Sequence, residues 1–151
     1  MRILCLDIGH KRIGIAVCDE TETLARSVAV IERNGGEIQK IRALAVEFAA
    51  IRILFGIPFR HDGSMGPAAE KILSYVETLK KEIAVAFEPW DERFTTKEAE
   101  NILLTADLGR SKRKKVIDRL AAQIILQDYL DSRKPPPEPG EFPSEFPSDP
   151  F

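Results

Sequence analysis

Hydrophobic and polar residues alternate at the start of the chain in the way that is typical of β-strands. Residues 4–7 and 12–17 predict two strands, and the short connection at 8–11 predicts that they form a hairpin. Residues 27–31 predict a third strand, which the sequence Asn-Gly-Gly at 34–36 ends. The first part of the chain therefore predicts an antiparallel meander of three strands.

The spacing then changes to that of helices separated by strands. Residues 37–50 carry apolar side chains every three or four positions, which predicts a helix with one buried face. The continuous apolar run at 51–56 predicts a strand covered on both faces. Pro67 suits the first turn of a second helix that runs to about Lys81, and residues 83–87 predict a fifth strand.

Two more helices are expected before the end of the domain. Thr95 and Glu98 have the spacing of a capping box, and Ser111 can cap a last helix that runs to about Ser132. The order of elements predicts an α/β fold: a mixed five-stranded sheet, made of the antiparallel meander and two parallel strands, flanked by helices.

Composition divides the chain into a globular domain at 1–134 and a tail at 135–151. The tail holds seven prolines, four of the 24 acidic residues and none of the 22 basic ones, so the domain carries a net charge of +2. Its repeated Glu-Phe-Pro-Ser predicts an extended segment, which is either solvated or docks a partner through Phe142 and Phe146.

The chain shows no signal peptide and no apolar run long enough to span a membrane, which predicts a cytoplasmic protein. Cys5 and Cys18 lie in predicted strands without the spacing of a zinc site. We expect both to be small buried hydrophobic residues.

Acidic residues occur in three separate segments, each expected at the rim of the sheet. Asp7 ends the first strand, Asp91 and Glu92 follow the fifth, and Asp118 lies in the last helix beside small and apolar positions. Carboxylate oxygens are the ligands that Mg²⁺ and Mn²⁺ prefer, and such ions can activate water for phosphodiester cleavage. The three segments predict a metal site if they converge.

Each acid also has an ordinary structural explanation, and spacing alone leaves the choice open. Asp7 could cap a turn and Glu92 could pair with Arg93. Asp118 could pair with Lys114 or Lys115 at helical spacing.

A basic run lies just before Asp118. The segment 110–115 holds five cations in six residues at a helix N-terminus, where the helix dipole already favours anions. Phosphates of a nucleic acid would relieve this concentration of charge, and such contacts fix position without reading sequence. The alternative is a solvated basic face.

Two other features carry less weight. The glycine-rich segment at 56–67 could present backbone amides to an anion, but it lacks the Gly-Lys-Ser/Thr ending of a P-loop. Trp90 could stack on a base or pack in the core.

Five motifs in the chain together resemble the YqgF (RuvX-like) family over residues 1–131. They are Asp7-Ile8-Gly9 with Arg12-Ile13-Gly14-Ile15-Ala16-Val17; Gly56-Ile57-Pro58; Gly63 with Gly66; Asp91-Glu92-Arg93-Phe94-Thr95-Thr96; and Lys114-Lys115-Val116-Ile117-Asp118 with Ala121-Ala122 and Ile125-Leu126-Gln127.

The resemblance implies a ribonuclease H-like fold and a nuclease that processes the 5′ end of pre-16S rRNA or resolves Holliday junctions. It implies that Asp7, Glu92 and Asp118 are the catalytic residues and the ligands of Mg²⁺ or Mn²⁺. Asp91 is the alternative to Glu92, because neighbours on a strand point to opposite faces. The cations expected to bind the nucleic acid are Arg12, Arg93, Arg110, Lys112, Arg113, Lys114 and Lys115.

Several alternatives stay open at the level of sequence. The substrate could be pre-rRNA, with ribosomal particles as possible partners, or branched DNA, and the protein could be a monomer or a homodimer. A resolvase needs two symmetric active sites. A non-catalytic RNA- or ribosome-binding factor is a third candidate. The Asp7-Ile8-Gly9 segment also resembles the phosphate loop of actin-like ATPases, which need two such domains, whereas this chain has room for one.

Overall fold

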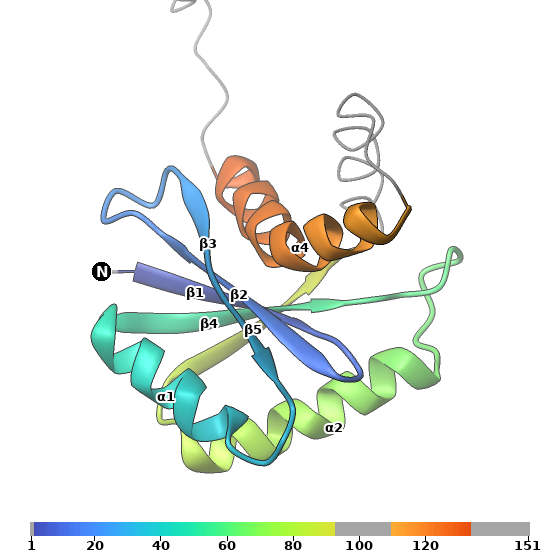
Figure 1. Cartoon of the computed structure of the whole chain (residues 1–151), viewed down its shortest axis with the longest axis horizontal. Coiled ribbons are helices and arrows are strands. Elements are labelled where there is room, and N and C mark those ends of the chain that lie inside the picture. Colours follow the sequence, from blue (N-terminus) through green and yellow to red (C-terminus); the bar gives the residue numbers. More distant parts are fainter. Residues whose placement is uncertain (1, 93–109, 134–151) are drawn as a thin grey trace, which may run out of the picture.

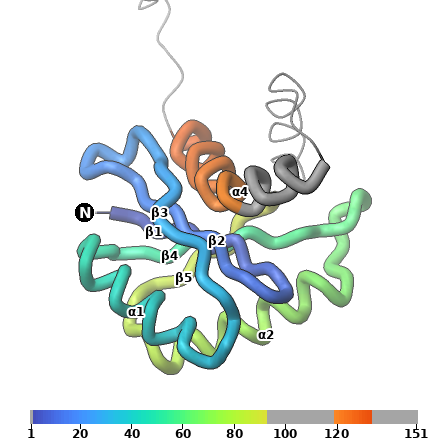
Figure 2. The backbone as a smooth tube through the Cα atoms, viewed as in Figure 1, coloured from blue at the N-terminus to red at the C-terminus, as the bar shows by residue number. Residues whose placement is uncertain are grey.

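The computed structural model describes residues 2–92 and 110–133, with side chains of the last helix described from Arg119 onward. The strands are β1 (Arg2–Ile8), β2 (Arg12–Cys18), β3 (Ala25–Glu32), β4 (Ala50–Ile57) and β5 (Ala86–Asp91), and the helices are α1 (Glu37–Glu47), α2 (Pro67–Glu82) and α4 (Arg110–Ser132). Figure 2 follows the chain from the β1–β2 hairpin through β3 to α1. No helix in the described part of the chain is long and apolar enough to cross a membrane.

The strands form one five-stranded sheet in the order β3-β2-β1-β4-β5. β2 pairs antiparallel with both β1 and β3, whereas β4 pairs parallel with both β1 and β5. The predicted mixed sheet of a three-stranded meander and two parallel strands is therefore confirmed.

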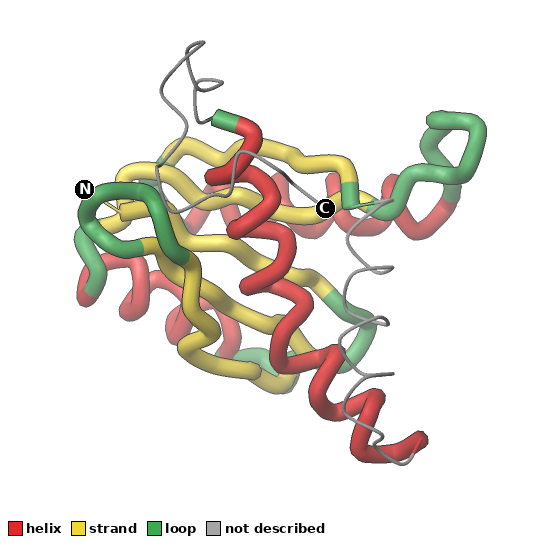
Figure 3. Tube along the Cα trace, turned by 90° about the horizontal axis from the view of Figure 1, so that it is seen from above, coloured by secondary structure: helices red, strands yellow, loops and turns green. Residues whose placement is uncertain are grey.

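The helices cover both faces of this sheet. α1 and α2 lie on one face and α4 on the other (Figure 1). Seen from above, α4 runs across the strands, and the other two helices lie behind the sheet (Figure 3). Because side chains alternate along a strand, β1 contributes Leu4 and Leu6 to the core under α1 and α2, and Ile3 and Cys5 to the core under α4.

Most predicted elements agree with the structure to within two residues, and the exceptions have local causes. α1 ends at Glu47 rather than at residue 50, because Ala49 turns the chain with a φ of 50° and Ala50 already begins β4. The fifth strand is Ala86–Asp91 rather than 83–87. Ile83 instead ends α2, where its N–H donates to the carbonyl of Leu79 at 2.9 Å.

Three further expectations concern the second half of the chain. Ser111 does not lie outside the last helix as a cap, because α4 already includes Arg110. The helix expected from Thr95 and the tail at 135–151 lie outside the described residues. Cys5 and Cys18 are buried as expected, and the Ile3 N–H donates to Cys18 Sγ at 3.2 Å.

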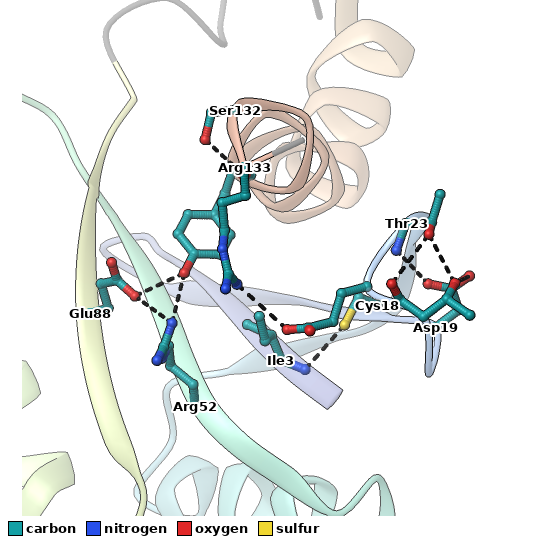
Figure 4. A network of polar contacts seen from close by, with 11 residues as sticks. Ile3, Cys18, Asp19, Thr23, Arg52, Glu88, Ser132 and Arg133 are labelled. Carbon is teal, nitrogen blue, oxygen red and sulfur yellow. Dashed lines mark hydrogen bonds and ion pairs between the residues drawn. The ribbon is translucent and has the colours of Figure 1, made fainter. Parts of the chain in front are cut away.

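A buried tyrosine connects α4 to two parallel strands. The Tyr129 hydroxyl accepts a hydrogen bond from Arg52 of β4 at 2.9 Å and donates to Glu88 of β5 at 3.0 Å. Arg52 and Glu88 also pair directly at 3.2 Å (Figure 4). The Tyr129 ring meets Trp90 edge-on, with centroids 5.2 Å apart. Packing against α4 is therefore the role that the structure gives Trp90, rather than an exposed stacking surface.

Two glutamines of α4 bind the outer edge of β3. Gln127 accepts the N–H of Ala25 and Gln123 accepts that of Ser27, both at 2.9 Å. Gln127 also donates to the carbonyl of Thr23 at 3.0 Å. Side-chain amides thus supply partners that a neighbouring strand would supply elsewhere in a sheet.

The hydrogen bonds of Tyr129 should stabilise the docked helix. We expect Tyr129→Phe to lower the free energy of unfolding by about 0.5–1.5 kcal/mol, because two half-exposed partners each lose a hydrogen bond while the ring contacts remain. Urea denaturation measures the change. Tyr129→Leu serves as the comparison and should cost more, since the ring contact is lost as well. A Tyr129→Phe protein as stable as the original would contradict this role of the hydroxyl.

Candidate active site

Two of the predicted acids meet on the face of the sheet that α4 covers. Asp7 has the same orientation along β1 as Ile3 and Cys5, which pack under α4. Glu92 directly follows β5, where its N–H donates to the carbonyl of Ile57 at 3.2 Å. β4 lies between these two strands, so a side chain must cross β4 for the two acids to interact.

Gly56 of β4 provides the room for that crossing. A Cβ at this position would overlap with Glu92 Oε2 and would lie 2.9 Å from Cδ1 of Ile125 on α4. The Glu92 carboxylate therefore lies over the backbone of Gly56, between the sheet and α4. Gly56 lies inside β4, as the apolar run at 51–56 predicts, rather than in the glycine-rich loop that follows.

The surroundings of Glu92 disfavour its charged form. Burial, then the nearby charge of Asp7, then that of Asp91 raise the pKa of Glu92 from 4.5 to about 7. The buried Cys5 thiol lies in the same field, and burial, Asp7 and Glu92 all raise its pKa. Negative charge is thus concentrated where the sheet meets α4, an arrangement that a bound cation would stabilise.

The neighbouring acid Asp91 has the other orientation along β5. Phe87 packs in the core under α1 and α2, whereas Trp90 packs in the core under α4. Because side chains alternate along a strand, Asp91 lies on the same face of the sheet as Phe87, and Glu92 lies on the same face as Trp90. Glu92, and not Asp91, therefore shares the face of the sheet that carries Asp7.

The third predicted acid and most predicted cations fall where side chains are not described. Asp118 and the basic residues at 110–115 belong to α4 by their backbone, and Arg93 lies outside the described residues. Arg12 is exposed at the start of β2. Among the side chains that the structure describes, no three of His, Cys, Asp or Glu form a group able to hold a metal ion.

Three amides of the loop between β4 and α2 make hydrogen bonds within the loop, so these three are not available to an anion. The N–H of Arg60 donates to the carbonyl of Ser64 at 2.9 Å, and that of Gly63 donates back to the carbonyl of Arg60 at 2.8 Å. The N–H of Ser64 donates to Asp62 Oδ1 at 2.9 Å. These three amides stabilise the loop itself.

Comparison with known proteins identifies the family to which the chain belongs. A family model described as RuvX, Holliday junction resolvase, matches residues 1–132. The chain belongs to the RuvX family. A relative from Clostridioides difficile (strain 630) is 46% identical over 132 residues, which cover 86% of this chain and 94% of that protein. One from Thermoanaerobacter pseudethanolicus is 42% identical over 137 residues, covering 89% and 99%. Both are named "Putative pre-16S rRNA nuclease".

Solved structures with the same fold include two resolvases. The RuvC protein of T. thermophilus in complex with a Holliday junction substrate has a TM-score of 0.52 at 19% identity and covers 88% of this chain and 96% of that one. The fowlpox virus Holliday junction resolvase has a TM-score of 0.51 at 13% identity, covering 87% and 99%. These likenesses concern the fold alone, and they confirm the ribonuclease H-like fold expected for this RuvX-family chain.

The raised pKa of Glu92 predicts that stability depends on pH when metal ions are removed. A carboxyl with a higher pKa in the folded chain contributes full stability below about pH 4.5 and loses it as the pH rises through about 7. We expect Glu92→Gln to raise the free energy of unfolding near pH 8 by on the order of 2 kcal/mol, and to change it little near pH 4. Urea denaturation in EDTA at both pH values measures this. Glu47→Gln, an exposed change on α1, is the control, and parallel pH profiles for all three proteins would contradict the assignment.

Because Glu92 and Ile125 lie so close to Gly56, adding one methyl group at this position should destabilise the fold. Gly56→Ala should lower the free energy of unfolding by about 1–3 kcal/mol, because Glu92 or Ile125 has to move. Gly36→Ala is the matched control, since a Cβ there comes no closer than 3.6 Å to Asn34 Oδ1. Thermal denaturation of the two variants compares them, and equal melting temperatures would show that the site has room for the methyl group.

Proposed function

We propose that this chain is a metal-dependent nuclease that hydrolyses phosphodiester bonds in the cytoplasm, acting in the processing of the 5′ end of pre-16S rRNA. The observation that carries the proposal is that Glu92, which lies over Gly56, is close enough to Asp7 for that charge to help raise the Glu92 pKa to about 7. Two partly buried carboxylates so close together repel each other, and a bound cation would relieve that repulsion. The names of the relatives in the same family agree with this chemistry.

Asp7, Glu92 and Asp118 are the proposed catalytic residues and the ligands of Mg²⁺ or Mn²⁺. The donor set fits these ions, which prefer carboxylate oxygens and keep water and phosphate as further ligands. Position 118 precedes Ile125 by seven residues, which is two helical turns of α4 and about 10 Å. Since Ile125 packs beside Glu92 and Gly56, this register supports a place for Asp118 on the same side of the helix.

The remaining parts of the site would bind and orient the substrate. When bound, a divalent ion supplies Lewis acidity and an activated water. Arg12, Arg93 and the basic residues Arg110, Lys112, Arg113, Lys114 and Lys115 would contact the phosphates on either side of the cleaved bond. α4 carries both Asp118 and the basic segment, so one helix would align the phosphate backbone with the acids.

Resolution of Holliday junctions is the second candidate, favoured by the description of the matching family model. It requires two active sites related by symmetry, and therefore a homodimer. Processing of rRNA would proceed with a monomer, on RNA in a ribosomal particle. A non-catalytic RNA- or ribosome-binding factor would keep the acids without needing them.

Removal of one carboxylate tests the nuclease. Asp7→Asn should reduce cleavage about a thousandfold or more, because several kcal/mol of transition-state stabilisation depend on the metal ligands. Folding and RNA binding should remain. The measurement is single-turnover cleavage of a pre-rRNA fragment and of a four-way junction, each titrated with Mn²⁺ and Mg²⁺.

Glu47→Gln is the control for this assay and should cleave like the original chain. Undiminished cleavage by pure Asp7→Asn protein would reject the metal site. If a dimer makes paired, symmetric nicks in the four-way junction, the result would favour junction resolution over rRNA processing. If the original chain cleaves neither substrate at any metal concentration, the nuclease proposal is rejected in favour of a non-catalytic RNA- or ribosome-binding factor.

A further inference from the structure

A pocket of about 340 Å³ lies next to the acid pair, at the end of the sheet where β1 and β4 finish and α2 begins. Its lining comes from five separate segments of the chain, and Glu92 belongs to both the pocket and the acid pair. The pocket is lined by Ile8, Gly9, His10, Arg33, Pro58, Ala68, Lys71, Ile72 and Glu92. None of the sequence motifs pointed to Arg33 or Lys71.

Arg33 is held in place before any ligand binds. Its Nη1 donates to the carbonyl of Gly9 at 2.8 Å, and its guanidinium carbon lies 4.2 Å from the centre of the Tyr75 ring. The Tyr75 hydroxyl in turn donates to Glu37 at 3.3 Å. A guanidinium has five donors in a fixed plane, and the bond to Gly9 uses one of them.

The same contacts fix the turn that carries His10. The N–H of Gly9 donates to the carbonyl of Arg12 at 2.8 Å, and the N–H of Arg33 donates to the carbonyl of Lys11 at 2.9 Å. A Cβ on Gly9 would lie only 2.7 Å from the Arg12 carbonyl oxygen, so this turn depends on a glycine. The wall of the pocket formed by β1, the turn and Arg33 is therefore preorganised.

The opposite wall is the first part of α2. Ala68, Lys71 and Ile72 lie within its first six residues, where backbone N–H groups give the helix end a partial positive charge. Lys71 adds a full charge across the pocket from Arg33. Two cationic side chains thus flank a pocket whose other polar side chains are His10 and the carboxylate of Glu92.

From this geometry we propose that the pocket binds one phosphate-bearing nucleotide of an unpaired strand, next to the bond that is cleaved. Arg33 and Lys71 bind its phosphate, and Ile8, Pro58 and Ile72 contact the sugar or base. The inference rests on the proposed function, because it extends the path of the substrate beyond the acid pair.

The size of the pocket favours a single strand over a duplex. Its volume lies at the lower end of the roughly 300–1,000 Å³ that small-molecule sites occupy, which suits one nucleotide. A paired nucleotide could enter only after leaving its stack, which costs a few kcal/mol. The pocket therefore selects substrates with an unpaired segment at the cleavage point.

Binding to a cleavage-inactive protein tests the pocket. In an Asp7→Asn background, Lys71→Gln should weaken binding of a fluorescent single-stranded oligoribonucleotide about fivefold to tenfold at 100 mM salt. The slope of log K against log salt should become shallower by roughly 0.7, the value for one phosphate contact on a single strand. Fluorescence anisotropy measures both quantities.

Two further variants separate the pocket from general charge. Lys81→Gln changes another exposed lysine, in the last turn of α2, and should leave affinity within twofold. Ala68→Leu keeps every charge but fills the pocket, and it should weaken binding of the single strand without changing the salt slope. A duplex of the same sequence should respond to neither Lys71→Gln nor Ala68→Leu.

Equal affinities for the Lys71→Gln and Lys81→Gln proteins would overturn the inference, as would a single strand that still binds fully to Ala68→Leu. An effect of the same size on the duplex would also overturn it. All three readouts are equilibrium affinities without catalysis, so they fail or succeed separately from the cleavage assay that tests the proposed nuclease.

Discussion

The packing of α4 against one face of the sheet is the interaction on which the rest of the structure depends. The helix covers Ile3, Cys5 and Leu54, and it partly buries Trp90 at the edge. Without this cover Glu92 would be hydrated, and its carboxylate would have no reason to differ from an exposed one. The same packing sets the space over Gly56, since Ile125 limits that space from above. The helix therefore determines both the stability of the domain and the chemical character of its acids.

This arrangement places two opposite requirements on the same few residues. A core is most stable when it is apolar, whereas a site for cations has to bring carboxylates together. The protein meets both by confining the acids to one end of the helix–sheet contact. Along the rest of that contact, the polar groups are matched, as at Tyr129 with Arg52 and Glu88. Among the described side chains, no buried nitrogen or oxygen lacks a hydrogen-bond partner.

The sequence was sufficient for most of the described elements and for their order, because hydrophobic periodicity depends on which faces are buried. It was misleading at Ile83, whose apolar side chain fits a strand as well as the end of a helix. Asp7 and Glu92 could be nominated from their positions at strand ends, but their approach depends on the order of strands in the sheet and on the missing side chain at Gly56. Arg33 could not be found, because its surroundings come from segments that share no motif and meet only in three dimensions.

The two glutamines that bind β3 have a consequence for how copies of this chain behave toward one another. An exposed edge strand is a template on which a second chain can add its own strand, and this is a common start of aggregation. Here a strand from a second chain would have to displace Gln123 and Gln127 from the N–H groups of Ser27 and Ala25. At the opposite edge, Pro89 of β5 has no N–H to offer. Both edges of the sheet thus resist extension at these positions, which favours self-association of the folded domain through side-chain surfaces over continuation of the sheet.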